Sequence, residues 1–363
     1  MNVRTGGNGV AKNIRQLSLT ELEQYFGTLG EPRFRAKQVW EWLWQKGAQS
    51  FADMTNLSKD LRQKLGEHFT FPVITVGSTQ VSGDGTIKTG FVTHEGHLCE
   101  GVLIPTDKRF TACVSSQIGC SLSCRFCATG YIDRKRNLEA AEIYDQVVLI
   151  NQQCEKTYNK KLSNIVFMGM GEPLLNYKNV LGAIERITAP DGLAMSPSRI
   201  TVSTAGVVKA IRQLGDDKVK FKLALSLHAP NDKKRNEIMP INESNHLQAL
   251  IDALNYFYRQ TKSEITFEYI LFNNFNDSIQ DADELIRIYR QVPADLVNII
   301  EYNPIDFAQF EKPSAERVKE FMDYLGRNKV NAHLRRSRGK DIDAACGQLA
   351  NRNNNSASIL GGA

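Results

Sequence analysis

Residues 113–130 read CVSSQIGCSLSCRFCATG, and this stretch holds four of the chain's seven cysteines. They stand at Cys113, Cys120, Cys124 and Cys127, so the last three follow a C-x3-C-x2-C spacing. The triplet comes just after a strand-like apolar run, where a loop would emerge from the end of the strand. Three thiols this close together, on a loop containing serine and glycine, are typical of a metal site rather than of inert core cysteines.

Two kinds of metal site fit this spacing. A [4Fe–4S] cluster takes four ligands, one on each iron, so three protein thiolates would leave one iron open to a non-protein ligand. Zinc is the alternative, because C-x2-C pairs are common in zinc sites and Cys113 or His97 could supply a fourth ligand. The zinc-dependent nucleobase deaminases are excluded, since their H-x-E and P-C-x-x-C motifs do not occur in this chain.

The bulk composition is that of an ordinary globular protein. The chain has 363 residues, 42% hydrophobic and 23% charged, with a net charge of +5 that leans mildly toward anionic partners. No apolar run approaches the roughly 20 residues that a membrane span needs, and the basic start lacks the apolar core of a secretory signal. We therefore expect a cytoplasmic protein, without membrane contact, whose thiols are reduced.

Beyond the cysteine loop the sequence alternates between strand-like and helical patterns. Strand-like runs include RFTACV (109–114), LSNIVFMGM (162–170) and LVNIIEYNP (296–304), and helical segments such as NLEAAEIYDQVVLINQ (137–152) separate them. Regular βα alternation predicts an α/β fold with a parallel sheet and right-handed crossovers. Six or so units fit a partial (βα)6 barrel, although periodicity alone also allows an open doubly wound sheet.

The whole chain divides into five parts by pattern. We expect a disordered N-terminus (1–13), a small N-terminal helical accessory domain (14–71), a β-hairpin connector (72–108), the barrel (109–349) and a disordered tail (350–363). The connector is indicated by alternating residues around an Asp84-Gly85 turn signal. In the helical domain, core packing is the expected role for most of Trp40, Trp42 and Trp44, with RNA stacking by one of them as the alternative.

The cysteine triplet resembles the signature of radical S-adenosylmethionine (SAM) enzymes, in which SAM chelates the open iron of a [4Fe–4S] cluster on a βα barrel. The local match is closer still. CVSSQIGCSLSCRFCATG, MGMGEPLLN, VSTAG, LSLHAPND and GKDIDAACGQLA together resemble the RlmN/Cfr family of RNA adenosine methyltransferases, and its RlmN branch in particular. The resemblance runs from about Leu19 to Leu349 and implies a radical SAM barrel ending in a catalytic segment, preceded by an RNA-binding helical domain.

The resemblance implies the cofactors and their ligands. Cys120, Cys124 and Cys127 would hold the [4Fe–4S] cluster. The residues that would bind SAM lie after successive strand-like runs: Gly171, Glu172, Ser203, Ser226, Leu227, His228 and Asn303.

The resemblance also implies three catalytic residues. Cys346 would carry a methyl group as S-methylcysteine, and Cys113 would release the methylated base from a covalent RNA–protein adduct by forming a disulfide with Cys346. Glu100 would accept the proton from the substituted base carbon. Cys99 and Cys154 match no role in the family.

The implied reaction is methylation of carbon 2 of an adenosine in RNA. The substrates would be the peptidyl-transferase-centre adenosine of 23S rRNA and the adenosine 3′ to the anticodon in tRNA, with a flavodoxin- or ferredoxin-like electron donor and a monomeric enzyme. Three basic clusters (134–136, 233–235 and 335–340) could ring the site and make RNA binding salt-dependent. Two alternatives stay open: Cfr-type methylation of carbon 8, and a non-catalytic zinc-dependent nucleic-acid-binding module.

Overall fold

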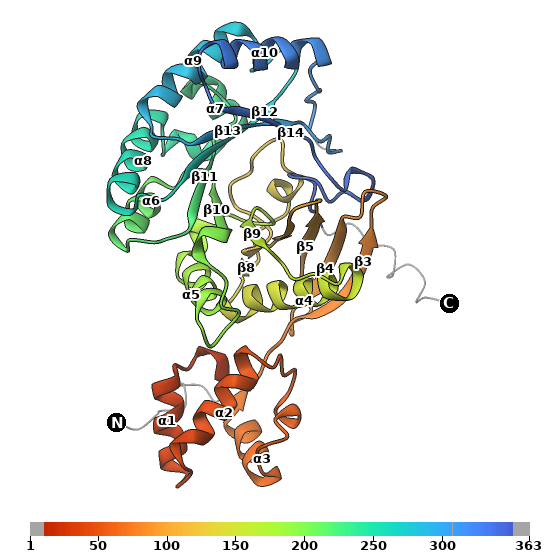
Figure 1. The fold of residues 1–363 in the computed structure, drawn as a ribbon, viewed down its shortest axis with the longest axis vertical. Helices are drawn as coiled ribbons and strands as arrows, with labels where there is room; N and C mark the ends of the chain where they lie inside the picture. Colours follow the sequence, from red (N-terminus) through yellow and green to blue (C-terminus); the bar gives the residue numbers. More distant parts are fainter. Residues whose placement is uncertain (1–10, 307, 351–363) are drawn as a thin grey trace.

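The computed structural model describes residues 11–306 and 308–350. The N-terminal lobe, drawn in red and orange at the bottom of Figure 1, contains the helices α1 (Leu19–Thr28), α2 (Arg33–Trp44) and α3 (Lys59–His68). Ser18 caps α1: its hydroxyl accepts the N–H of Glu21, and the Glu21 carboxylate accepts the N–H of Ser18. This capping box explains why the helix begins where the sequence signals it.

Both ends of the described chain are more ordered than the sequence suggested. Lys12–Asn13 form strand β1, which pairs in parallel with β2 (Phe69–Thr70), although disorder was expected over residues 1–13. At the other end, the N–H of Ala350 donates to the Glu100 carboxylate (2.9 Å). The rest of the two expected disordered segments, residues 1–10 and 351–363, lies outside the described residues.

A buried ion pair joins the lobe to the barrel. Arg15 donates to both carboxylate oxygens of Asp145 on helix α4 (Ala140–Tyr158) (2.7 Å each), and its guanidinium lies over the ring of Trp44 (5.5 Å). The indole N–H of Trp40 donates to Asp191 on the barrel side (2.7 Å). Trp40 and Trp44 therefore pack between the two parts of the molecule, as the core-packing interpretation predicted.

A ten-stranded sheet forms the larger part of the molecule, in the order β14-β13-β12-β11-β10-β9-β6-β5-β4-β3. Seven of its strands are parallel: β6 (Phe110–Cys113), β9 (Asn164–Phe167), β10 (Ile200–Thr204), β11 (Lys222–Ser226), β12 (Ile265–Leu271), β13 (Leu296–Glu301) and β14 (Ala332–Arg335). The order follows the sequence without the reversal of a doubly wound sheet, and the two end strands do not pair. The fold is therefore the partial barrel that the βα alternation predicted.

Helices connect the parallel strands around the outside of the sheet (Figure 1). They are α4 (Ala140–Tyr158), α5 (Tyr177–Thr188), α6 (Val208–Asp216), α7 (Asp232–Ile238), α8 (Leu247–Thr261), α9 (Ile279–Gln291) and α10 (Ala315–Arg327). Within the part of the chain that the structure describes, no helix is both long and apolar enough to cross a membrane. A two-stranded sheet, β7 (Gln117–Ile118) with β8 (Arg136–Asn137), flanks the cysteine loop.

The expected connector takes a different form. It contains three antiparallel strands, β3 (Thr75–Val81), β4 (Ile87–Val92) and β5 (Leu98–Pro105), which continue the main sheet because β5 pairs with β6. The Asp84-Gly85 turn lies between β3 and β4, where the sequence placed it, and Gly85 has a φ of +85°. This region is therefore a wing of the barrel sheet rather than a separate hairpin.

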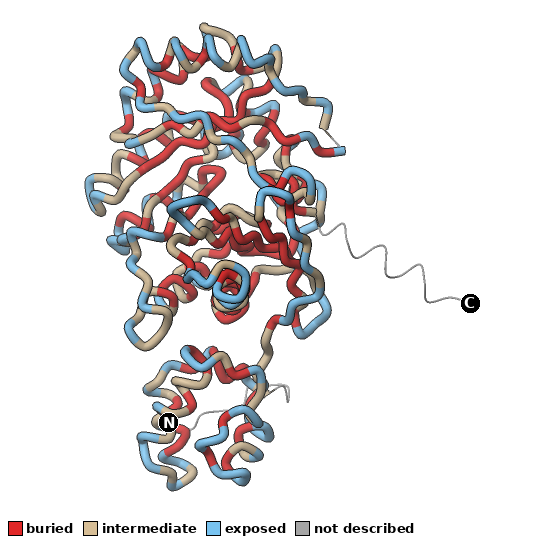
Figure 2. Tube along the Cα trace, turned by 45° about the vertical axis from the view of Figure 1, so that its right-hand side comes forward, coloured by how far each residue is buried: buried red, intermediate tan, exposed pale blue. Residues whose placement is uncertain are grey.

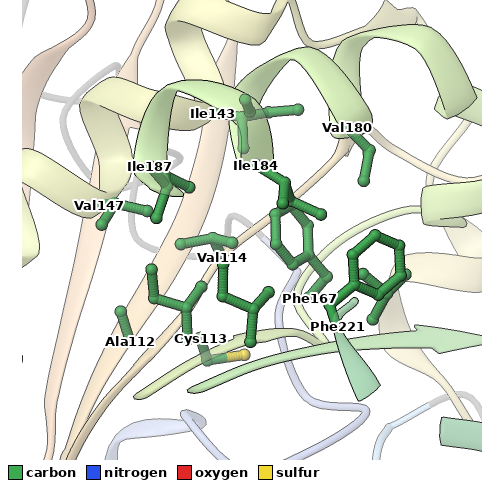
Figure 3. Close-up of a cluster of buried hydrophobic side chains, with 14 of the residues drawn as sticks. Ala112, Cys113, Val114, Ile143, Val147, Phe167, Val180, Ile184, Ile187 and Phe221 are labelled. Atoms are coloured by element: carbon green, nitrogen blue, oxygen red, sulfur yellow. The ribbon is translucent and has the colours of Figure 1, made fainter. Parts of the chain in front are cut away.

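Buried residues follow the inner strands of the sheet (Figure 2). Figure 3 shows one such cluster, in which Val114 and Phe167 lie beneath Ile143 of α4 and Ile184 of α5, all fully or nearly fully buried. Cys113 lies at the lower edge of this cluster. The apolar core therefore holds β6 and β9 in place. The cysteine loop follows β6 and β7, and the loop that contains Gly171 follows β9.

Candidate active site

The cysteine triplet lies on a loop after β7 that close contacts hold in shape. Gly119 precedes the triplet with a φ of +75°, and a Cβ there would lie 2.3 Å from the carbonyl oxygen of Asp133, so only glycine fits. The N–H of Cys127 donates to the carbonyl of Cys124 (3.2 Å). The loop therefore folds back on itself between the second and third thiols.

All three thiols border one cavity of about 150 Å³ at the C-terminal ends of the strands, which we call the cluster-side cavity. It brings together most residues that the sequence assigned to the site: Cys120, Cys124, Cys127, Gly171, Glu172, Ser203, Ser226, His228 and Cys346. Leu227 and Asn303 do not line it. The carbonyl of Leu227, a fully buried residue, instead accepts the Nε–H of Arg235 (3.0 Å).

Gly171 and Glu172 stand in the loop after β9. A side chain at Gly171 is excluded, because φ is +92° and a Cβ would lie 2.4 Å from that of Gln117. The N–H of Glu172 donates to the Gln117 amide oxygen (2.8 Å), and the Glu172 carboxylate accepts the N–H groups of Leu174 (2.9 Å) and Ala205 (2.7 Å). Burial raises the pKa of Glu172, and these backbone hydrogen bonds act in the opposite direction.

His228 follows β11 in a left-handed conformation (φ +53°) that is uncommon for residues other than glycine. Its Nδ1 accepts the N–H of Ile270 (3.2 Å), and its ring meets Phe126 edge to face (centroids 4.8 Å apart). Burial, together with the charge of Arg235, lowers the pKa of His228 to about 3. The ring is therefore neutral near pH 7, and because Nδ1 accepts, Nε2 carries the proton and can donate to a ligand.

A second cavity of about 420 Å³, which we call the barrel cavity, is lined by the first residues of the parallel strands, such as Thr111 and Asn164, and by the C-terminal segment (336–350) after β14. Cys113 lines this cavity and not the cluster-side cavity. Burial raises the pKa of the Cys113 thiol to about 12, and the nearby guanidinium of Arg335 opposes this shift.

Five side chains border both cavities and form the wall between them: Met168, Glu268, Ile300, Arg335 and Cys346. Cys346 thus lies between the cavity of the cysteine triplet and the cavity of Cys113. Arg335 pairs with the buried Glu268 (Nη1 to Oε2, 3.4 Å). The sequence analysis missed Glu268, although a carboxylate inside the apolar run EITFEYILF is a signal of a buried, paired charge.

The end of the C-terminal segment is tied to the cysteine loop. The carbonyl of Gly347 accepts the N–H of Ala128 (2.7 Å), and the carbonyl of Leu349 accepts the hydroxyl of Thr129 (2.7 Å). Both bonds are made just after Cys346 in the chain, and they hold this part of the segment beside the triplet.

Asn303 follows β13 and supports the same segment. Its Nδ2 donates to the carbonyl of Cys346 (3.2 Å) and to the hydroxyl of Ser337 (2.9 Å). Its Oδ1 is buried and has no hydrogen-bond partner among the described residues. A buried acceptor of this kind marks a place for an external donor, which is the property expected of a ligand-binding residue.

Glu100 lies on β5, is buried and borders neither cavity. The register pairs Val102 with Cys113, so Glu100, two residues earlier, has its side chain on the same face of the sheet as Cys113. Its carboxylate lies 3.7 Å from Lys88 Nζ and accepts the N–H of Ala350. The structure thus places Glu100 beside the end of the C-terminal segment.

The donor set of the triplet fits an iron–sulfur cluster. Burial raises the pKa of Cys120, Cys124 and Cys127, so these thiols ionise readily only if a bound cation offsets their charge. Among the described residues, no three His, Cys, Asp or Glu side chains converge as they would around one metal ion. A tetrahedral zinc needs its sulfurs within about 4 Å of one another, whereas a [4Fe–4S] cluster takes its thiolates on separate irons.

The three basic clusters are not simply surface charge. In each, one arginine is used internally: Arg136 pairs with Glu142 (2.7 Å), Arg235 is fully buried and donates to backbone carbonyls, and Arg335 lies in the wall between the cavities. Arg136 and Arg235 therefore serve the fold, whereas Arg335 borders both cavities of the site.

Comparison with known families and proteins agrees with the geometry. The family model described as the ribosomal RNA large subunit methyltransferase N-terminal domain (RlmN) matches residues 12–71, and that of the radical SAM superfamily matches residues 114–286. Members of this superfamily use SAM and an iron–sulfur cluster.

The similar proteins cover nearly the whole chain. A probable dual-specificity RNA methyltransferase RlmN of Cytophaga hutchinsonii is 57% identical over 93% of each chain, and a dual-specificity RNA methyltransferase RlmN of Nitratidesulfovibrio vulgaris is 44% identical over 93% of this chain and 94% of its own. The crystal structure of a radical SAM methyltransferase from Sphaerobacter thermophilus is 40% identical, with a TM-score of 0.87 over 93% of this chain and 99% of that one. The chain therefore belongs to the RlmN family and is a SAM-dependent RNA methyltransferase of the radical SAM superfamily.

Proposed function

We propose that this enzyme methylates carbon 2 of the peptidyl-transferase-centre adenosine in 23S rRNA and of the adenosine 3′ to the anticodon in tRNA. The observation that carries the proposal is the position of Cys346 in the wall between the two cavities. A thiol at this place can receive a methyl group from one side and deliver its carbon to a base on the other. The RlmN relatives favour carbon 2 over the carbon 8 of the Cfr branch.

The target carbon explains why a thiol carrier is needed. Carbon 2 of adenine is an electron-poor amidine carbon, so it cannot attack the methyl group of SAM by ordinary displacement. A carbon radical can add to it. The methyl group is therefore first transferred to the sulfur of Cys346, with S-adenosylhomocysteine and a proton as the other products, and is then activated there.

The cofactors would occupy the cluster-side cavity. Cys120, Cys124 and Cys127 would hold a [4Fe–4S] cluster. SAM would lie against the assigned residues of that cavity, where the Nε2–H of His228 can donate to it. Asn303 lies outside this lining and would contribute by holding the backbone of Cys346. When bound, cluster and SAM supply the carbon radical that activates the methyl group on Cys346 and take back the electron that the base adduct loses.

Release of the product is the task of the second thiol. Cys113 loses its proton and attacks the sulfur of Cys346, so that the S–S bond forms as the bond between sulfur and the methylene carbon breaks, and this proton balances the one that the released carbon takes up. The electron pair leaves with that carbon, which takes up a proton to become the new methyl group. Glu100, on the same face of the sheet as Cys113, would accept the proton of the ring carbon, although it borders neither cavity in the structure. A thiol reductant must return two electrons to the disulfide after each turnover.

The barrel cavity would take the target adenosine. Its volume of about 420 Å³ lies within the usual range of ligand sites, and Arg109, Lys222, Arg336 and Arg338 line it. These cations can neutralise phosphates, so RNA binding should weaken with salt by roughly one log unit per log unit of salt for each contact. A flavodoxin- or ferredoxin-like protein would supply the electron, and we expect the enzyme to act as a monomer.

The first test uses anaerobically purified enzyme. We expect about four irons and four sulfides per chain, an added methyl group on the peptide that contains Cys346, and 2-methyladenosine in digested RNA after turnover. Zinc in place of iron together with an unmodified Cys346 would remove the basis of the proposal. Finding 8-methyladenosine would keep the carrier but overturn the assignment of carbon 2.

The second test separates the two thiols. Cys113→Ala should accumulate a covalent RNA–protein adduct, because no thiol attacks the sulfur of Cys346. Cys346→Ala should abolish methyl transfer while its iron content stays normal. Free methylated RNA at normal yield from either variant would contradict the role given to the substituted residue.

A further inference from the structure

The start of the C-terminal segment is held by the turn between β3 and β4, a contact that the proposed reaction does not use. The carboxylate of Asp341 accepts the hydroxyl of Ser82 (2.6 Å) and the N–H of Gly83 (3.0 Å). Ser82 is buried, although it lies on a turn. These bonds join residues that are 258 and 259 positions apart in the chain.

A second carboxylate makes the contact reciprocal. Asp84, on the turn, accepts the N–H of Gly339 on the segment (3.0 Å). Burial alone would raise the pKa of Asp84, but hydrogen bonds from Thr86, Gly339 and Ser82 outweigh it and lower the pKa to about 2. The carboxylate is therefore ionised near pH 7, where charge-assisted hydrogen bonds are stronger than neutral ones.

The C-terminal segment and the β3–β4 turn also pack closely around Gly339. Gly339 has a φ of +65°, and a Cβ there would lie 2.9 Å from a methyl carbon of Thr86 and 2.7 Å from Cβ of Ala344. The carbonyl of Gly339 accepts the N–H of Ala344, two residues before Cys346 (2.9 Å). The contact at Gly339 therefore also holds the backbone of Ala344, which lies close to the carrier thiol of Cys346.

The segment needs such support because it contains almost no regular structure of its own. Between its start at residue 336 and its end at residue 350, only Lys340–Ile342 form a helical turn. The bonds to Ala128, Thr129 and Asn303 hold the end of the segment near Cys346. The bonds of Asp341 to Ser82 and Gly83 and of Asp84 to Gly339, which we together call the clasp, hold its start.

We propose that the β3–β4 turn is a positioning element for the methyl carrier: Asp341 and Asp84 fix the C-terminal segment so that the sulfur of Cys346 stays in the wall between the cavities. The inference rests on the proposed function for the role of Cys346. Loss of the clasp leaves the other end of the segment attached, so cluster and SAM binding persist while the sulfur samples a wider range of positions. A displacement of about 1 Å at a reacting group can cost roughly 100-fold in rate.

The first experiment measures the clasp itself, by hydrogen exchange of peptides from 336–350 in the RNA-free holoenzyme. Asp341→Ala should speed exchange in these peptides about tenfold, because two hydrogen bonds to a charged group are lost. Ser82→Ala should have a smaller effect, and adding it to Asp341→Ala should change little, since the two residues act through one bond. Asp107→Ala, which removes an exposed carboxylate from the β5–β6 turn, is the control with the same change of charge.

The second experiment measures the consequence for the reaction. Asp341→Ala should lower kcat roughly 100-fold, with iron content, melting temperature and KM for RNA close to those of the parent, and Asp341→Asn should recover part of the rate by accepting the Ser82 hydroxyl. Unchanged exchange in Asp341→Ala would show that the turn does not hold the segment. Faster exchange with an unchanged kcat would overturn the positioning role.

The two proposals can fail separately. The exchange measurement needs neither RNA nor turnover, so its result stands even if the methyl-carrier chemistry is wrong. Failure of the proposed function would appear as activity retained in Cys346→Ala, which the clasp variants do not test.

Discussion

The cysteine loop and the C-terminal segment both carry thiols to the same cavity, but they are held there in opposite ways. In the loop, Gly119 packs against Asp133 and Cys127 bonds to Cys124, so contacts with nearby residues shape it, although Ala128 and Thr129 also bond to the distant Gly347 and Leu349. In the segment, the partners of the residues around Cys346 lie up to 259 positions away. A short motif can therefore specify the first arrangement, whereas the second depends on the complete fold.

The difference predicts how each region responds to change. A locally held loop should lose its function when one ligand or one glycine is replaced, because no other contact substitutes for it. A segment held by several distant bonds should lose stability in steps of roughly 1 kcal/mol, about the net value of one hydrogen bond.

The largest effect should follow replacement of a loop thiol. We expect Cys124→Ser to lose the cluster and all methyl transfer, since three ligated irons are needed to hold it. Iron and sulfide analysis after anaerobic reconstitution measures the outcome. Cys154→Ser, at a buried cysteine of α4, is the control and should keep its iron. Full iron content in Cys124→Ser would mean that the loop is not the cluster site.

The next largest effect should come from Gly171→Ala, where the loop after β9 meets Gln117. A Cβ at 2.4 Å from another Cβ, at a φ of +92°, cannot be accommodated without moving the backbone. We expect a loss of about 3 kcal/mol in unfolding free energy and weaker SAM binding, measured by denaturation and calorimetry. Gly326→Ala in α10 meets nothing within 4 Å and should stabilise the protein by up to about 1 kcal/mol. Equal effects of the two variants would contradict the close approach at Gly171.

The same contrast explains how much of the fold was predictable. The parallel strands and their helices are visible as periodicity, because each is a local pattern. The β3–β5 wing was read as a separate connector (72–108). Alternation predicts the strands of this region but not their neighbours, so it does not predict that β5 pairs with β6.

The site residues also fall into two groups, those that short motifs specify and those that depend on the complete fold. The triplet and the glycine of the loop after β9 lie in short motifs, and the structure brings them to one cavity. In the wall Glu268 pairs with Arg335, and in the clasp Asp84 bonds to Gly339 and Asp341 bonds to Ser82, so the partners are distant in sequence. The apolar surroundings of Glu268 indicate a paired charge, but no local pattern identifies its partner. Only the fold makes these residues partners.

His228, which packs on the cysteine loop through Phe126, should give a measurable pH effect. Its pKa of about 3 in the folded state lies below the unfolded value of about 6.5, so the unfolded chain binds the extra proton and stability falls as the pH drops below 6.5. At pH 5 the loss should approach about 2 kcal/mol, at roughly 1.4 kcal/mol per pH unit. His228→Asn, which tolerates the left-handed backbone, should flatten this dependence in denaturation curves from pH 5 to 8. An equally steep decline in the variant would assign the effect to other groups.

The smallest predicted effect tests a side-chain bond that joins the two regions directly. Thr129→Val keeps the shape of the side chain but removes the hydroxyl that donates to the carbonyl of Leu349. We expect a local loss of about 1 kcal/mol, which is roughly a fivefold faster hydrogen exchange at the N–H of Ala350.

That amide reports the loss because it is the next donor along the segment and bonds to Glu100. Thr188→Val, whose hydroxyl bonds within its own helix, should leave the exchange of Ala350 unchanged. If Thr129→Val also left it unchanged, the distant contacts alone would hold the segment, and the two regions would be mechanically independent although they share a cavity. A fivefold change would instead show that the cysteine loop, once folded by its own sequence, serves as the surface on which the end of the Cys346 segment is placed.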